Sequence, residues 1–254
     1  MKYTDLDLKK PMESNNYKEE SEFVVSSVKQ ILDEKKVIGD NKIIINTNLK
    51  MRLPLENINK LAAPMIEAWA FEVFSEIRDD FENKYKLINV EAQERLGMSD
   101  IILQFRKNED VITGNIDVKA TSNNIKNSGK SPNITSFSRI RTAYIQNPDF
   151  IFIILSIKHK VYNERDNITL AMNGIMELTD FKVYDLKYVS EKDISYNPSL
   201  GTGQIQIKDI HYVEYEYRTT WEMCQLLDRK YLNSSRRTIE NFYREAVKNK
   251  WIKE

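Results

Sequence analysis

Two short apolar segments separated by a polar turn constrain the fold of this chain more than any other feature of its sequence. Residues 101–105 and 111–118 are mostly β-branched or otherwise apolar, whereas residues 106–110 are polar or charged. Apolar runs of this length, joined by a short run of turn-forming residues, are typical of a β-hairpin. We therefore predict two antiparallel strands at the centre of the fold.

The register of this hairpin is expected to place two carboxylates side by side. If the hairpin is symmetric about the junction between Asn108 and Glu109, residues whose numbers sum to 217 face each other, and Asp100 lies opposite Asp117. Side chains opposite each other in an antiparallel pair have Cβ atoms about 5 Å apart, which suits two carboxylates that share a divalent cation. Residues two apart on a strand share a face, so Lys119 projects with Asp117.

Paired carboxylates with a neighbouring lysine are suited to the hydrolysis of a phosphodiester. A divalent cation offsets the charge that develops on the phosphate, and the lysine orients or activates a water molecule. An acidic residue two positions before a lysine recurs along this chain, so the usual interpretation is a solvated salt bridge at a strand end. The hairpin context instead favours a nuclease centre with Asp100, Asp117 and Lys119 as catalytic residues.

Composition favours a soluble, cytoplasmic, globular protein. The chain has 254 residues, of which 41% are hydrophobic and 30% charged, and its formal net charge is zero. Its longest apolar run, residues 150–155, is too short to span a bilayer, and its N-terminus lacks the apolar core of a signal peptide, so we expect no membrane association. The single cysteine, Cys224, excludes an internal disulfide, and the two histidines, His159 and His211, are too few and too isolated for a zinc site.

Hydrophobic periodicity predicts further helices and strands around the hairpin. In chain order, we expect an N-terminal arm over about 1–22, a helix over 23–35 with Ser21 as its N-cap, a strand or buried extended piece over 42–49, and a helical stretch over 58–81 that is kinked or restarted at Pro64. After the hairpin we expect a crossover helix over 137–146, a buried central strand over 150–157, strands over 168–172, 181–189 and 204–217, and helices over 221–231 and 238–251. An apolar stripe of Ile58, Leu61, Met65, Trp69 and Val73 is expected in the core. These elements favour a single domain over 1–254 with a C-terminal helical section over about 219–254.

The segment that follows the hairpin is expected to bind nucleic acid. Residues 118–148 contain no acidic residue, and their basic residues are Lys119, Lys126, Lys130, Arg139 and Arg141. Cations bind phosphates, and the amide and hydroxyl side chains that are frequent here suit base edges. We expect Asn133 to contact bases, although a mobile surface loop is an equal interpretation of the composition alone. The basic residues after 229 have the ordinary interpretation of a solvated helix face.

The run SDIIL, a hairpin, and then IDVKATSNNIKNSGKSPNITS resembles the blunt-cutting PD-(D/E)XK type II restriction endonucleases. Ser99 stands where the family motif has proline. The resemblance extends more weakly to Pro64 and Glu67, to residues 203–206 and to residues 218–221. It implies an α/β (α+β) fold of the restriction-endonuclease type, with a central mixed β-sheet flanked by helices.

The resemblance also implies roles for individual residues. Asp100, Asp117 and the backbone carbonyl of Val118 would bind Mg²⁺. Lys119 would assist the attacking water, and Glu67 would be an acidic helix residue that reaches the metal region.

A set of polar residues on both sides of residue 130 would contact DNA. By the same resemblance these are Asn124, Lys126, Lys130, Ser131, Asn133, Ser136, Arg139, Arg141, Gln204 and Gln206. A blunt-cutting relative has a glutamine that wedges between base pairs where this chain has Lys130. That departure leaves phosphate or groove contact, rather than intercalation, as the expected role of Lys130.

The expected function is Mg²⁺-dependent cleavage of both strands of a short palindrome in double-stranded DNA, with blunt ends and 5'-phosphates. Two identical half-sites call for a homodimer with one active site per strand. The cellular counterpart would be a cognate DNA methyltransferase, and the family alone suggests sites resembling GTTAAC. A repair or junction-cleaving nuclease of the same fold and a non-catalytic DNA-binding protein stay open as alternatives, although a pure binder gains nothing from carboxylates beside phosphates.

Overall fold

The computed structural model describes residues 1–94, 97–199 and 201–253 of the chain. These residues form two compact units. Unit 1 comprises Met1–Glu20, Lys130–Ile151 and Asp185–Glu254, and unit 2 comprises Ser21–Gly129 and Phe152–Tyr184. The chain passes repeatedly between the two units, so no single break in composition marks the division.

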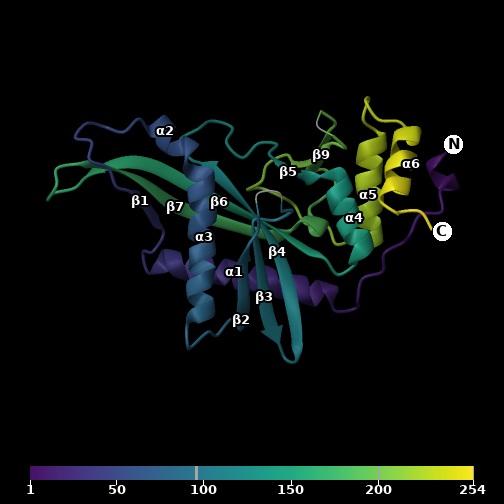
Figure 1. Ribbon diagram of the computed structural model, residues 1–254, viewed down its shortest axis with the longest axis horizontal. Helices are drawn as coiled ribbons and strands as arrows, with labels where there is room; N and C mark the ends of the chain where they lie inside the picture. The colour runs from purple at the N-terminus through teal and green to yellow at the C-terminus, as the bar shows by residue number, and fades with distance from the viewer. Residues whose placement is uncertain (95–96, 200, 254) are drawn as a thin grey trace. The chain divides into compact units, whose positions relative to one another are not determined.

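Unit 2 is built on a six-stranded sheet (Figure 1) with the strand order β1-β7-β6-β4-β3-β2. Its strands are β1 (Lys42–Ile45), β2 (Leu87–Ala92), β3 (Ile101–Lys107), β4 (Asp110–Ser122), β6 (Ile151–Arg165) and β7 (Met172–Asp185), and its helices are α1 (Tyr17–Val37), α2 (Leu55–Lys60) and α3 (Ala62–Asp79). The predicted α+β fold, a central mixed sheet flanked by helices, is confirmed. β6 lies inside the sheet, as predicted for the apolar run at 150–157.

The β3–β4 hairpin has the predicted register. Ile101 pairs with Ile116 and Lys107 with Asp110, so paired residue numbers sum to 217 along the whole hairpin. The turn is closed by Asn108, which has a positive φ of 57°, a conformation that asparagine tolerates better than most residues. The same strand pairing is therefore favoured by the alternation of apolar and polar residues and by the residues of the turn.

The packing of α1 on this hairpin depends on a glycine. A Cβ atom at Gly114 of β4 would lie 2.7 Å from Cγ1 of Val24, so only glycine allows this close approach. The Phe23 ring lies edge-on to Phe105 of β3 at 5.7 Å between centroids. Strand β4 is thereby held against α1 on the face opposite to Asp117, because side chains alternate along a strand.

Two predictions about the helices of unit 2 need correction. α1 begins at Tyr17, so Ser21 is buried inside the helix and does not cap it. The expected apolar stripe is also partly wrong, because Leu61 is 50% and Met65 37% exposed while Ile66 is buried. The predicted helix is interrupted at Leu61, between α2 and α3, and this break shifts the rotational phase of the residues that follow it.

The helix restart predicted near Pro64 is confirmed. Pro64 lies in the first turn of α3, where the missing N–H of proline costs no hydrogen bond.

The predicted strand over 168–172 is wrong, because these residues mostly form the turn between β6 and β7. The Asp166 carboxylate accepts hydrogen bonds from the backbone N–H groups of Ile168 (2.8 Å) and Thr169 (2.7 Å). Such an Asx turn satisfies the backbone locally and competes with a strand. Ile168 is 93% exposed as a result.

Unit 1 combines a three-stranded sheet, in the order β5-β9-β8, with three helices. Its elements are β5 (Asn133–Ser136), β8 (Ile194–Asn197), β9 (Gln204–Ile207), α4 (Phe137–Gln146), α5 (Thr220–Leu232), α6 (Ile239–Lys248) and the 3-10 helices η1 (Tyr3–Asp5) and η2 (Leu186–Tyr188). The predicted strand over 204–217 ends at Ile207, and the strand expected over 181–189 ends in β7 at Asp185, where η2 follows. The helices predicted at 137–146, 221–231 and 238–251 are confirmed to within a few residues. Ser136, Thr219 and Thr238 cap their N-termini and so determine where they begin.

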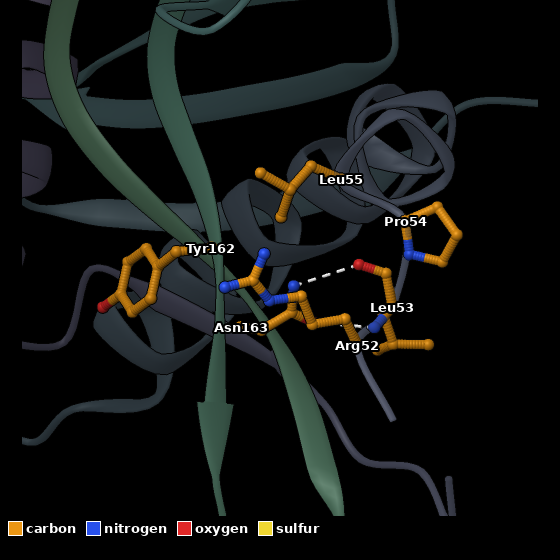
Figure 2. A pocket seen from close by; sticks show the side chains of 6 residues that line it. All are labelled: Arg52, Leu53, Pro54, Leu55, Tyr162 and Asn163. Carbon is orange, nitrogen blue, oxygen red and sulfur yellow. Dashed lines mark hydrogen bonds between the residues drawn. The ribbon is translucent and has the colours of Figure 1, made fainter. Parts of the chain in front are cut away.

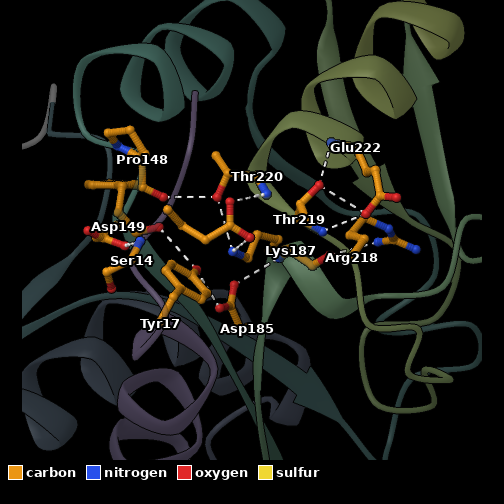
Figure 3. Close-up of polar contacts among 12 residues, drawn as sticks. Ser14, Tyr17, Pro148, Asp149, Asp185, Lys187, Arg218, Thr219, Thr220 and Glu222 are labelled. Carbon is orange, nitrogen blue, oxygen red and sulfur yellow. Dashed lines mark hydrogen bonds and ion pairs between the residues drawn. The ribbon is translucent and has the colours of Figure 1, made fainter. Parts of the chain in front are cut away.

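The N-terminal residues of unit 1 are fixed by polar contacts, some of them buried (Figure 3). The Tyr17 hydroxyl donates to Asp185 Oδ2 at 2.7 Å, and the Ser14 N–H donates to Asp149 Oδ1 at 2.7 Å. The fully buried Lys187 ammonium donates to Thr220 Oγ1 at 3.0 Å and lies 3.0 Å from the centroid of the Tyr17 ring. These contacts join the N-terminal arm to the start of α5.

Among the described residues, no helix is both long and apolar enough to cross a membrane.

Candidate active site

The start of β3 and the end of β4 bring the two predicted aspartates together in unit 2. Asp100 directly precedes β3, and its N–H donates to the carbonyl of Ile116 at 2.9 Å, a bond that is offset by one residue from the pairing of Ile101 with Ile116 inside the hairpin. Its Oδ2 accepts the Val118 N–H at 2.7 Å. The regular pairing ends at Ile101 and Ile116, so the predicted pairing of Asp100 with Asp117 is not part of the ladder, but the Asp100 carboxylate is held at the end of β4 and lies near enough to Asp117 for its charge to act on that residue.

Asp117 is buried and only half paired. The Lys119 ammonium donates to its Oδ1 at 2.7 Å, which confirms that the two side chains share a face of β4. Its Oδ2 is buried and has no hydrogen-bond partner in the part of the chain that the structure describes. Burial raises the pKa of Asp117 to about 7; the Lys119 charge works against this shift, and the Asp100 charge adds to it.

Glu67 approaches the same site from α3. Together with Ser99, Asp100 and Ile101 it lines a pocket of about 440 Å³ between α3 and the hairpin. Partial burial raises the pKa of Glu67, the Asp100 charge raises it further, and the Lys119 charge lowers it. The charges of Asp100 and Lys119 therefore both act on the Glu67 carboxyl group.

The donor set suits a hard divalent cation. Within the described ranges no group of three or more His, Cys, Asp or Glu side chains is arranged to hold a metal ion. The oxygens on hand are those of Asp100 and Asp117 and the backbone carbonyl of Val118. The buried, unpaired Oδ2 of Asp117 is the group that a cation would satisfy, because Mg²⁺ and similar ions take oxygen ligands.

A second pocket, of about 520 Å³, lies elsewhere in unit 2 (Figure 2). It is lined by Arg52, Leu53, Pro54, Leu55, Tyr162 and Asn163. The Asn163 side chain exchanges two hydrogen bonds with the backbone of Leu53, at 3.0 and 3.1 Å. None of the described residues that line this pocket is a carboxylate.

Two of the predicted DNA-contacting residues lie in unit 2, in the loop after β4. Lys126 is exposed. Asn124 is exposed too, but its Oδ1 accepts the Val161 N–H at 2.9 Å, so the side chain also fixes this loop to β6.

The other predicted DNA-contacting residues lie in unit 1, on or beside the paired strands β5 and β9 and, for Arg139 and Arg141, on α4. Asn133 lies opposite Gln206, and Ser136 opposite Gln204. Lys130 forms an ion pair with Asp209. Sequence patterns did not reveal the pairing of residues 130–136 with 204–209, because about 70 residues separate the two segments.

Arg141 is wrongly predicted as a DNA contact. Its side chain is fully buried, and it donates to Asp228 from Nε at 3.0 Å and from Nη2 at 3.3 Å. Its guanidinium lies 5.3 Å from the centroid of the Trp251 ring. The helical spacing of the sequence already indicated that Arg141 is buried. Phe137, Ile140 and Tyr144 form the apolar face of α4, and Arg141 lies on that face. Arg139, two residues earlier, is exposed.

Comparisons with known proteins point to one family. The model of the family described as "Type II restriction endonuclease HpaI" matches residues 4–250. The chain is 68% identical to the type II restriction enzyme HpaI of Haemophilus parainfluenzae over 254 residues, which covers all of both chains. Among solved structures, it is similar to the NlaIV restriction endonuclease with a TM-score of 0.45 and 12% identity, over 86% of this chain and 83% of that one.

Proposed function

The chain belongs to the HpaI family of type II restriction endonucleases, enzymes that cleave DNA at specific sites, and we propose that its reaction takes place at Asp100, Asp117 and Lys119. The observation that carries this proposal is the state of Asp117. One of its oxygens is held by Lys119, and the other is buried without a partner among the described residues, while the Asp100 charge acts on the same carboxyl group. Family membership also selects a restriction enzyme over the repair nuclease and the non-catalytic binder that sequence patterns left open.

Mg²⁺ is the proposed metal ion, with Asp100, Asp117 and the backbone carbonyl of Val118 as its ligands. When bound, the ion would supply positive charge against the negative charge that develops on the phosphate. The protein's own contribution is to hold the two carboxylates in place: the Val118 N–H fixes Asp100, and the sheet buries Asp117.

Lys119 and Glu67 have supporting roles in this proposal. The Lys119 ammonium, held on Asp117, donates to a water molecule and orients it toward the phosphorus. Glu67 stays outside the ligand set and adds negative charge beside Asp100, which favours a cation at that position.

The finer properties of the reaction are proposals as well. A homodimer would cut the two strands of a palindrome symmetrically and leave blunt ends with 5'-phosphates. A cognate DNA methyltransferase would protect the host DNA, and both proteins would act in the cytoplasm. The DNA contacts would come from Lys126 in unit 2 and from the exposed polar residues of unit 1.

Incubation of the purified protein with unmethylated plasmid DNA tests this proposal. With Mg²⁺ we expect discrete fragments whose sequenced ends share one palindrome, and with EDTA we expect no cleavage, because no cation would then offset the charge on the phosphate. Cleavage at equal rates in EDTA would contradict the metal proposal, and sequenced ends with overhangs would contradict the blunt cut.

A further inference from the structure

One face of the small sheet in unit 1 carries uncharged polar side chains. Ile205 and Ile207 of β9 are fully buried, so Gln204 and Gln206 project from the opposite face. Asn133, the residue paired with Gln206, is exposed at the start of β5. A paired β-ribbon is narrow enough to enter the major groove of B-DNA, where amide side chains can reach base edges.

A chain of hydrogen bonds fixes the orientation of the Asn133 amide. The Nε2 of Gln206 donates one hydrogen to the backbone carbonyl of Ser131 and the other to Oδ1 of Asn133, both at 2.9 Å. A backbone carbonyl can only accept, so the Gln206 amide cannot be reversed without losing its bond to Ser131. Asn133 must therefore turn its oxygen toward Gln206.

The backbone beneath this chain of bonds is itself constrained. Ser131 has a positive φ of 48°, a conformation that is costly for a residue with a side chain. It is held there because its N–H donates to the carbonyl of Lys208 at 3.0 Å and its own carbonyl accepts from Gln206. Strained residues that neighbouring contacts hold in place are concentrated at functional sites.

The fixed Asn133 amide leaves a defined set of hydrogen-bond donors and acceptors that a ligand can use. Both hydrogens on Nδ2 of Asn133 and the second lone pair of Oδ1 are unused by any residue that the structure describes. Asn133 thus offers a donor next to an acceptor, in an order that Gln206 sets. The major-groove edge of adenine offers the complement, an acceptor at N7 and a donor at the 6-amino group, whereas guanine offers two acceptors.

We infer that Asn133 reads an adenine in the major groove and that Gln206 is the positioning residue that makes this reading selective. Nδ2 of Asn133 donates to N7 of the adenine, and Oδ1 accepts from its 6-amino group while it still accepts from Gln206. This inference rests on the proposed function, because it takes a specific DNA site as the substrate.

The test uses synthetic duplexes that carry the palindrome mapped by end sequencing. Each adenine in turn is replaced by 7-deazaadenine, which lacks the N7 acceptor, or by purine, which lacks the 6-amino group. At one adenine of each half-site we expect each replacement to lower kcat/KM about 10- to 100-fold, the cost of one lost base contact. A palindrome without adenine, or one whose adenines all tolerate both replacements, would overturn the inference.

The variant Gln206→Met tests the positioning role. Methionine keeps the length of the side chain but cannot hold the Asn133 amide, so we expect the preference for adenine over purine at that position to fall toward 1. Gln204→Met is the matched control, because it removes an amide from the same face of β9 that has no bond to Asn133. Whatever Gln204→Met does to overall affinity, it should leave this preference ratio unchanged. A Gln206→Met protein with the full preference ratio would overturn the inference.

Asn133→Asp keeps the inference testable if Gln206→Met fails to fold. Aspartate still accepts from Gln206 but has no donor for N7, so 7-deazaadenine should cost this variant nothing further, whereas purine should still lower kcat/KM. Equal sensitivity to the two analogues in this variant would overturn the inference. Failure of the proposed function looks different, because the wild-type protein would then show no Mg²⁺-dependent cleavage at a palindrome.

Discussion

Replacing Asp117 by asparagine is expected to lower the rate of DNA cleavage about 1000-fold or more while the protein stays folded. The substitution keeps the size of the side chain but removes the negative charge that Asp117 brings to the proposed metal site. Charge stabilisation in a water-poor site contributes several kcal/mol to a phosphoryl transition state, and each 1.4 kcal/mol is about tenfold in rate. Single-turnover cleavage of the mapped duplex measures this loss.

The matched control for this variant is Asp110→Asn. Asp110 lies on the same strand, but it is exposed at the hairpin turn, across from Lys107. We expect its loss to change the cleavage rate less than about twofold, because exposed charges contribute little. An Asp117→Asn protein that cuts at the wild-type rate would remove Asp117 from the catalytic centre.

The same variant is expected to gain stability when no metal ion is present. Asp117 has a pKa of about 7 in the folded protein but about 3.9 when unfolded. Between these two pH values the folded state binds more protons than the unfolded state, so the free energy of unfolding falls as pH rises. Asparagine does not titrate, so Asp117→Asn should equal the wild type near pH 4 and exceed it by about 2 to 4 kcal/mol above pH 7.

Urea denaturation in EDTA at several pH values measures this difference. Asp110→Asn is again the control, since an exposed carboxylate contributes little to the dependence of stability on pH. A constant difference between Asp117→Asn and the wild type from pH 4 to pH 8 would show that the Asp117 carboxyl titrates alike in the folded and unfolded states.

The central hairpin and its carboxylate pair could be predicted because both depend on local rules. The period-two alternation and a short polar turn determine one register, and its last pair, Ile101 with Ile116, brings the adjoining Asp100 and Asp117 close together. The α4 helix was predictable for the same reason, since its apolar spacing and the Ser136 cap lie within one short segment.

Contacts between distant segments could not be predicted from these rules. The pairing of Asn133 with Gln206 joins residues that are 73 positions apart, and no periodicity encodes which strand lies beside which. The exposure of Leu61 and Met65 had a different cause, since a one-residue break between helices changes which side chains face the core. The charge of a segment predicted its DNA contacts least reliably. A basic residue in a segment without acidic residues can still form an ion pair with a carboxylate that is distant in the sequence.

Arg141 illustrates this last point, and its replacement by methionine is expected to lower the free energy of unfolding by about 3 to 5 kcal/mol. The change leaves the Asp228 carboxylate, which is 1% exposed, without its cation, while the Tyr3 hydroxyl still donates to it at 2.7 Å. Burial already raises the pKa of Asp228, and Arg141 opposes that shift, so the loss should be larger at pH 8 than at pH 5. Urea denaturation at both pH values measures it.

Two comparisons separate this structural role from DNA binding. Arg139→Met changes an exposed arginine on the same helix and should cost less than about 1 kcal/mol, whereas the double variant Arg141→Met/Asp228→Leu should recover most of the loss because it removes the stranded carboxylate. An arginine that contacts a phosphate contributes about one unit to the slope of log affinity against log salt concentration. We expect that slope to be unchanged in folded Arg141→Met. A slope reduced by about one unit, together with little loss of stability, would instead place Arg141 on the DNA.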